Sequence, residues 1–263
     1  MPKETFGGDD EGGAAVEEKK RKLDLSKYSK GPDMNIRDVF WSIVGTYGAK
    51  KGHVPDFSGL ENDRFALVRV AIGAISGPSP LRVRLTPGHI ARYSIMMVLD
   101  AGWQDCFTEF LEDCAPRESQ RKAVLAGLKK IEEDLAYSRR LVESLRMMLR
   151  QHETSAIALR YAAELRSAKM TEELKKELTI FARGDIGENQ LNAMATLAML
   201  RGDLEVIKTM TLLLSHWDEA ARKAAAEFLL KNRSAEGDAA AGRRLDKETD
   251  PLVRAVLEKI IKK

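Results

Sequence analysis

The chain has 263 residues, of which 44% are hydrophobic and 32% are charged, so it is long and apolar enough to bury a core and is not a wholly disordered protein. Its 43 Lys and Arg residues against 40 Asp and Glu residues leave a formal net charge of +3, which excludes a uniformly cationic nucleic-acid binder and confines such a role to a local patch. Only 8 prolines and 6% aromatic residues favour an all-α fold over a sandwich or barrel of short strands.

Residues 1–32 are predicted to form a flexible charged arm. They hold two glycine pairs, an acidic run and the basic run Lys19–Lys22, and nothing in them can bury a core. The basic run could contact phosphates or serve as a localisation signal. Because acidic and basic residues balance across the arm, we favour a solvated tail.

Residues 33–116 are predicted to form a compact N-terminal helical lobe. A first helix follows Asp33 or Asn35, either of which could cap it, and Arg64–Ser76 has the apolar pattern of a second helix. Thr86 and the proline after it make a good N-cap and first turn for a third helix. We expect this third helix to continue to Leu111 with a bend at Gly102.

The cysteine content indicates a reducing compartment. Cys106 and Cys114 lie in one apolar-periodic stretch, and on a continuous helix they would be about 12 Å apart along its axis, which is too far for a disulfide. No apolar run has the length of a signal peptide or a membrane span. We therefore expect an intracellular protein that does not enter a membrane. The expected location is the cytoplasm, and a nuclear location is left open.

Residues 117–138 are predicted to form a long connecting helix. From Val124 to Leu149, apolar residues alternate four and three apart, with Ser138 at the one missing place. This is a heptad seam on one long helix, or on two helices that meet near Tyr137. We favour packing of the seam against the chain's own lobes over a dimeric coiled coil, although residues 124–149 and the N-terminal arm are the two segments through which copies could associate.

The most informative pattern is a repeat near the end of the chain. Leu212–Lys231 and Leu245–Lys263 align at a spacing of 32 residues. A period in this range is typical of a helical solenoid, which presents an extended binding surface rather than an active-site pocket. Two acids and two arginines are in register between the copies: Asp218 with Asp250, and Arg222 with Arg254.

The pattern resembles the HEAT repeat, in which a first helix ends in an Asp-containing turn before a second helix that opens near Val-Arg and continues with small residues. Weaker units precede the two copies, Thr171–Arg183 with Glu188–Arg201, and Arg140–Gln151 with Ser155–Arg166. The resemblance covers residues 139–263. It implies that a HEAT-like α-solenoid of three to four units follows the N-terminal lobe.

Two groups of residues are expected to hold this solenoid together. Alanines in the second helices, such as Ala163, Ala195 and Ala224, let neighbouring helices approach closely. In repeats of this kind the turn acid and the helix arginine often tie adjacent units. The resemblance therefore implies a stacking role for Asp218, Arg222, Asp250 and Arg254.

A basic patch lies in the N-terminal lobe, where no Asp or Glu occurs between Arg64 and Leu99. Arg82 and Arg84 fall on one side of an extended segment, just before a helix N-terminus that favours anions. Arginine binds phosphate bidentately and a tyrosine could stack on a base. The candidate set for nucleic-acid or partner binding is Arg64, Arg69, Arg82, Arg84, His89, Arg92 and Tyr93.

A competing interpretation, which we favour, pairs these arginines with acids of the same lobe or turns them toward a protein partner. The acidic residues concerned are Asp100, Asp105, Glu109, Glu112 and Asp113.

No catalytic or metal-binding signature is present. The sequence has none of the glycine-rich phosphate loops, zinc motifs or nucleophile elbows that mark common enzymes, and its four histidines are scattered, so we expect no metal and no cofactor. Trp103 and Trp217 precede acids, as in some HEAT-like DNA glycosylases, but fold analogy alone does not carry an activity. We interpret Trp217 as a packing residue.

The sequence thus predicts a non-enzymatic interaction protein, a scaffold or adaptor that binds a protein or peptide partner on its helical-repeat surface. The alternative is a nucleic-acid-binding protein, either a coat-like RNA binder or a regulatory factor, which uses the Arg64–Arg92 patch and the basic arm. An enzyme is the third choice.

Overall fold

The computed structural model describes residues 35–49, 54–81 and 84–262. Within these ranges the chain forms thirteen α-helices and one short 3₁₀ helix, and no β-strand. The predicted all-α, solenoid-like fold is confirmed. None of the helices in this part of the chain combines the length and hydrophobicity of a membrane-spanning segment.

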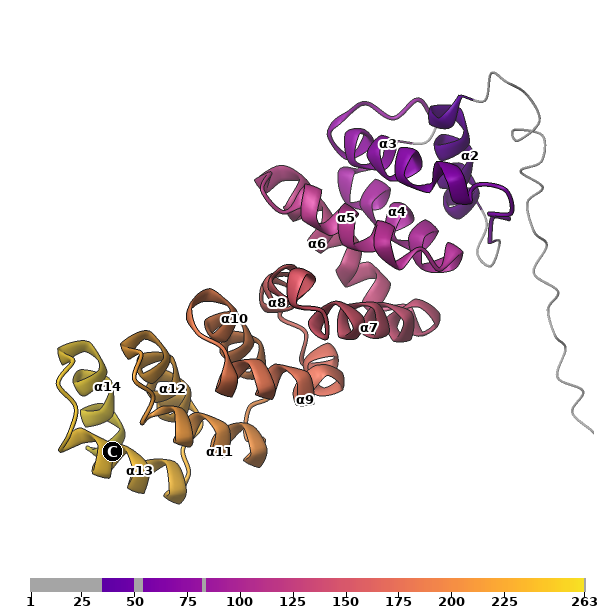
Figure 1. Cartoon of the computed structure of the whole chain (residues 1–263). Coiled ribbons are helices and arrows are strands. Elements are labelled where there is room, and N and C mark those ends of the chain that lie inside the picture. Colours follow the sequence, from indigo (N-terminus) through magenta and orange to yellow (C-terminus); the bar gives the residue numbers. More distant parts are fainter. Residues whose placement is uncertain (1–34, 50–53, 82–83, 263) are drawn as a thin grey trace, which may run out of the picture.

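The N-terminal lobe contains five α-helices packed on one another (Figure 1). Their bounds are α2 Ile36–Ala49, α3 Arg64–Ser76, α4 Pro87–Ala101, α5 Gln104–Cys114 and α6 Glu118–Glu132, and the 3₁₀ helix η1, Glu61–Asp63, directly precedes α3. As predicted, Thr86 caps α4, because its side chain accepts a hydrogen bond from the backbone N–H of His89 at 3.3 Å.

The third helix of the lobe ends earlier than the sequence suggested. Gly102 adopts a left-handed conformation with φ 71°, and the N–H of Trp103 bonds back to the carbonyl of Val98 at 3.1 Å. Glycine takes this conformation without a Cβ clash, so it closes α4 instead of bending it. The expected bent helix is therefore two helices, α4 and α5.

The expected connecting helix at 117–138 also ends early. Asp134 accepts a hydrogen bond from the N–H of Ala136 at 3.1 Å and caps α7, Leu135–Leu149, so the heptad seam is divided between two helices. The first of these, α6, crosses α4 so closely that a Cβ on Gly127 would lie 2.7 Å from the backbone nitrogen of Arg92. Thus α6 packs as part of the N-terminal lobe.

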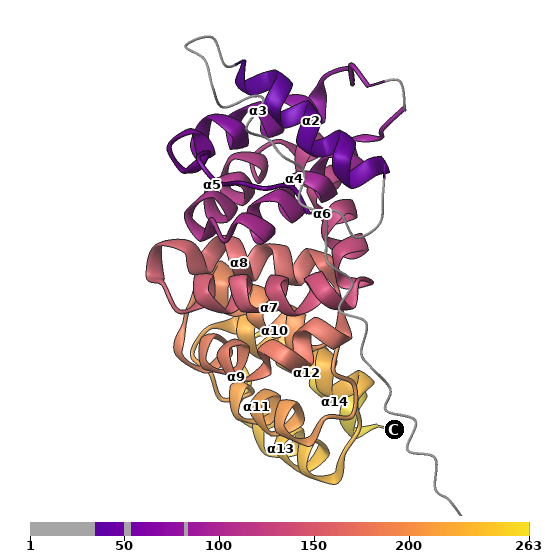
Figure 2. The same cartoon turned by 90° about the vertical axis from the view of Figure 1, so that its right-hand side faces the viewer.

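From α7 onward the helices form four consecutive pairs. These pairs are α7 with α8 His152–Leu165, α9 Ala168–Gly184 with α10 Gly187–Leu197, α11 Leu204–Leu213 with α12 Glu219–Lys231, and α13 Ala235–Leu245 with α14 Pro251–Ile261. The first helices of the pairs pack in one row and the second helices in another. Figure 1 shows the row α8, α10, α12 and α14 on the concave side of the arc, and Figure 2 shows the helices lying across its long axis.

The sequence did not reveal α13. This helix contains Gly237, Ala240 and Ala241 at its buried positions and no large apolar residue before Leu245. Hydrophobic periodicity therefore could not mark it, although its position completes the last pair.

A buried polar cluster joins the lobe to the first pair. Asp100 of α4, whose side chain is only 3% exposed, accepts hydrogen bonds from the hydroxyls of Tyr47 and Tyr137 at 2.8 and 2.6 Å and from Arg140 at 2.6 Å. Burial, together with the charge of Asp100, raises the pKa of both tyrosines well above their usual range. The hydroxyls therefore stay protonated and act as donors, which fixes α2 and α7 against α4.

Candidate functional site

The residues expected to tie the repeats act in two different ways. Asp218 and Asp250 are N-caps, since their carboxylates accept hydrogen bonds from Ala220 and Val253 at 2.9 and 2.8 Å. Arg254 forms only an exposed pair with a glutamate of its own helix at 3.4 Å. Of the four residues, Arg222 is the one that ties two units together.

The partner of Arg222 is Glu248, which the sequence did not single out. Two nitrogens of the Arg222 guanidinium bind the two carboxylate oxygens of Glu248 at 2.9 Å each, and Arg244 adds a third contact at 2.9 Å. Arg222 also donates to the backbone carbonyls of His216 and Trp217, at 3.0 and 2.8 Å. This network links the turn before α12 to the turn before α14.

The environment of Glu248 strongly favours its charged form. Burial acts to raise the pKa of this carboxyl, but the hydrogen bonds from Arg222, Arg244 and the N–H of Asp250 outweigh it and lower the pKa from 4.5 to about 2. The side chain is fully buried, and that of Arg222 is 8% exposed. These residues have a structural role and are not available to a ligand.

The N-terminal arginines are divided by their partners. Arg64 binds Asp105 at 3.0 Å and Arg69 lies 3.6 Å from Glu109, as the competing interpretation proposed. Arg92 lies 3.9 Å from an acid outside the expected set, Asp134. The predicted residue Arg82 falls outside the described residues.

The remaining members of the patch lie around a small cavity. Arg84, His89 and Tyr93 line it, together with residues of α2, and its volume is about 260 Å³. The Tyr93 ring is parallel to the rings of Tyr47 and His89, with centroid distances of 6.1 and 6.5 Å. Arg84 is exposed and therefore accessible, whereas Arg64, Arg69 and Arg92 each have an acidic neighbour.

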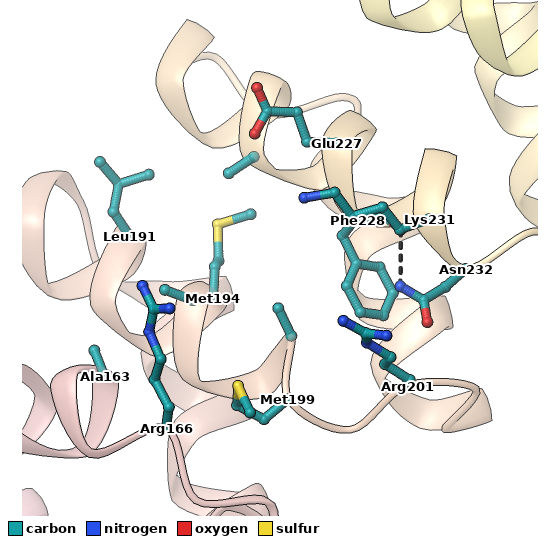
Figure 3. Close-up of a pocket in the computed structure, with 13 residues that line it drawn as sticks. Ala163, Arg166, Leu191, Met194, Met199, Arg201, Glu227, Phe228, Lys231 and Asn232 are labelled. Atoms are coloured by element: carbon teal, nitrogen blue, oxygen red, sulfur yellow. Dashed lines mark hydrogen bonds between the residues drawn. The ribbon is translucent and has the colours of Figure 1, made fainter.

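A larger cavity lies on the concave side of the solenoid. It has a volume of about 550 Å³ and is lined by residues of α8, α10 and α12 and of the turns that follow them. Figure 3 shows side chains from all three helices around one hollow. Its apolar surface is provided by Leu191, Met194, Met199 and Phe228, of which Met194 and Phe228 are almost fully buried.

Three cations surround this apolar surface. Arg166, Arg201 and Lys231 all line the cavity and are exposed, and no side-chain hydrogen bond or ion pair involves them within the described part of the chain. Glu227 is the one acid among the lining residues. The cavity therefore combines an apolar floor with an excess of unneutralised positive charge.

The sequence contained a signal for this site that was not recognised. In the sequence, the segments assigned to the second helices of three successive units each end with a cation, namely Arg166, Arg201 and Lys231. The alanines interpreted as close-packing residues include Ala163, Ala195 and Ala224, which line the cavity instead. Stacking of the units brings these positions together.

Trp217 is not the packing residue that we expected. Its side chain is 73% exposed, and its ring lies tilted against that of His216 at a centroid distance of 5.4 Å. The backbone carbonyl of Trp217 accepts a hydrogen bond from Arg222, so Trp217 contributes to the turn through its backbone and not through its side chain. Trp103, in contrast, is buried against Phe57.

No protein-family model matches the sequence, and a search of curated proteins finds no match. Among the described residues, no group of three or more His, Cys, Asp or Glu side chains is placed to hold a metal ion. The two cavities and the charges around them are therefore the features of the described structure that bear on its function.

Proposed function

We propose that this chain is a non-enzymatic scaffold with HEAT-like repeats that binds a protein or peptide partner on its concave surface. The observation that carries the proposal is the 550 Å³ cavity between α8, α10 and α12, where an apolar floor is surrounded by unpaired cations. Ligands bind in concave surfaces that combine apolar side chains with a few placed polar groups, and the concave face of a solenoid is an extended binding surface.

The nucleic-acid alternative has weaker support. Arg64 and Arg69 are already engaged with Asp105 and Glu109, and these acids would repel a phosphate that approached the same guanidiniums. Arg84 remains accessible beside the smaller cavity. Among the residues of the patch that the structure describes, one accessible and unpaired arginine does not provide the several phosphate contacts that non-specific nucleic-acid binding requires.

The state of the cysteines supports an intracellular, cytoplasmic location as part of this proposal. Cys106 and Cys114 are both buried and unpaired. Burial, reinforced by a neighbouring aspartate in each case, raises the pKa of both thiols to about 12. Such groups remain protonated and unreactive in a reducing compartment.

Site-specific photocrosslinking tests the proposed binding surface. A photoreactive amino acid replaces Ala195, an exposed residue that lines the cavity, and in a control it replaces Lys208, an exposed residue of the outer helix α11. In extracts of the native source we expect discrete protein or peptide adducts at position 195 and not at position 208. Adducts that disappear after nuclease treatment, or adducts at position 208 alone, would refute the proposal.

A further inference from the structure

We infer that the occupant of the concave cavity is an acidic linear peptide segment that carries one large apolar side chain. This inference rests on the proposed function and specifies the chemistry of its partner. Three features of the cavity support an acidic peptide with an apolar side chain: its charge, its apolar floor and the backbone conformation of Arg166.

The positive charge of the cavity favours a ligand with acidic groups. Arg166, Arg201 and Lys231 come from three successive units and have no acidic neighbour within ion-pair distance in the described structure. Three cations against the single acid Glu227 leave an uncompensated positive charge. A segment with several carboxylates would neutralise it, and complementary charge also gives specificity and fast association.

The apolar floor of the cavity favours a ligand that carries a large apolar side chain. Leu191 and Met199 remain partly accessible above the nearly buried Met194 and Phe228. Methionine side chains adapt to irregular shapes, so this floor can accept a large aliphatic or aromatic side chain. The lining alanines have small side chains that let the backbone of a peptide approach closely.

The backbone of Arg166 supports a binding role. It ends α8 in the left-handed conformation with φ 52°, the single positive φ of a non-glycine residue in the described ranges. Glycine or asparagine is favoured at such a helix end, so an arginine there carries a conformational cost. Strained residues of this kind cluster at functional sites, and here the strained residue directs an unpaired guanidinium to the cavity (Figure 3).

The same features favour a peptide over a nucleic acid. A nucleic-acid groove needs cations that follow the phosphate backbone and exposed rings on which bases stack. Phe228, the one aromatic residue that lines this cavity, is only 4% exposed, so its ring offers no face on which a base could stack. An apolar floor ringed by three cations suits carboxylates beside one apolar side chain.

A peptide-display selection on the full-length protein tests the inference, with the library of unbiased composition as the probe. We expect enriched sequences with net negative charge and a large apolar residue. Their dissociation constants should rise on the order of tenfold or more in the triple variant Arg166→Glu, Arg201→Glu, Lys231→Glu, because each exposed charge pair contributes a factor of roughly two to five. They should also rise with salt concentration.

A matched triple variant controls for the overall change in charge. Lys176→Glu, Lys208→Glu and Arg243→Glu alter exposed, unpaired cations on the outer helices α9, α11 and α13 by the same amount. Binding should be unchanged in this control. Equal loss in both triple variants would overturn the inference, because it would show a general effect of charge.

The outcomes distinguish the inference from the proposed function. Enriched peptides that are neutral or basic, yet lose affinity in the concave triple variant, would overturn the acidic-segment inference alone. Failure to enrich any peptide would overturn the inference. Binding of a 20-nucleotide oligothymidine that the concave triple variant abolishes would overturn the proposed function as well.

Two single substitutions separate a structural role of Arg166 from a binding role. Arg166→Gly relieves the left-handed backbone, so its unfolding midpoint should rise while the affinity for the selected peptides falls several-fold. Arg166→Lys should retain most of the affinity. If Arg166→Gly bound the selected peptides as tightly as the wild type, Arg166 would have no part in binding and the inference would fail.

Discussion

Replacement of Glu248 by glutamine should uncouple the last helix pair from the rest of the solenoid. The substitution keeps the size of the side chain but removes its charge. The Arg222 guanidinium, which is 8% exposed, then faces an amide that can accept only part of its hydrogen bonds. A buried charge left without its counter-ion is strongly destabilising.

The size of the effect follows from the carboxyl group. A pKa lowered from 4.5 to about 2 corresponds to about 3 kcal/mol of stabilisation at neutral pH. Breaking a buried ion pair from one side costs about 3–5 kcal/mol in proteins generally, which agrees. Because the folded pKa is depressed, this stabilisation is fully present above pH 4.5 and disappears as the pH falls through about 2.

Hydrogen exchange measured by mass spectrometry is the suitable assay, because a solenoid can open locally at its ends. In Glu248→Gln at pH 7, amides of α13 and α14 should lose protection while those of α8 keep it. Urea unfolding should show the difference between variant and wild type shrinking from pH 5 toward pH 2. Glu258→Gln, which removes the exposed partner of Arg254, should change stability by less than about 1 kcal/mol. Wild-type protection of α14 in Glu248→Gln would refute the reasoning.

Two further predictions concern the N-terminal lobe, and urea unfolding followed by circular dichroism measures both. Gly127→Ala places a Cβ 2.7 Å from the Arg92 backbone nitrogen and should lower the free energy of unfolding by about 1–3 kcal/mol. Gly73→Ala, whose Cβ meets open space in α3, should raise it by about 0.5–1 kcal/mol. Changes of the same sign in both variants would contradict the close crossing of α4 and α6. Asp100→Ala leaves the hydroxyls of the buried Tyr47 and the half-buried Tyr137 without their acceptor and should cost about 2–5 kcal/mol. Asp113→Ala, at an exposed site, should cost less than about 0.5 kcal/mol, and equal effects of the two substitutions would contradict the cluster.

The repeat was predictable because its signals are local. Asp218 and Asp250 cap helices through hydrogen bonds to residues two or three positions away, so their register is visible in the sequence. The linking partner of Arg222 was not predictable, because Glu248 lies in a turn with no apolar pattern around it. The helix α13 was not predictable for the same reason, because its buried positions hold glycine and alanine and give no pattern of large apolar residues.

The basic patch and the concave cavity differ in how far the sequence could predict them. The sequence showed that Arg64 and Arg69 precede a run of acids, and the favoured pairing with Asp105 and Glu109 is what the packing of α3 against α5 produces. The concave cavity could not be predicted in this way. Its cations belong to three units, and their convergence depends on how the units stack.

A purely helix-end role does not explain these cations. Positive charge near a helix C-terminus interacts favourably with the helix dipole, and Lys231, in the last turn of α12, fits that role. The last turn of α8 contains an acid, Glu164, instead of a cation, and the last turn of α10 has no basic residue. Arg166 and Arg201 stand beyond those turns, and Arg166 does so in a conformation that glycine would adopt at lower cost. Helix stability alone would favour glycine or asparagine at position 166 and gives no reason for a cation at position 201, so the shared property of the three cations is their position around the cavity.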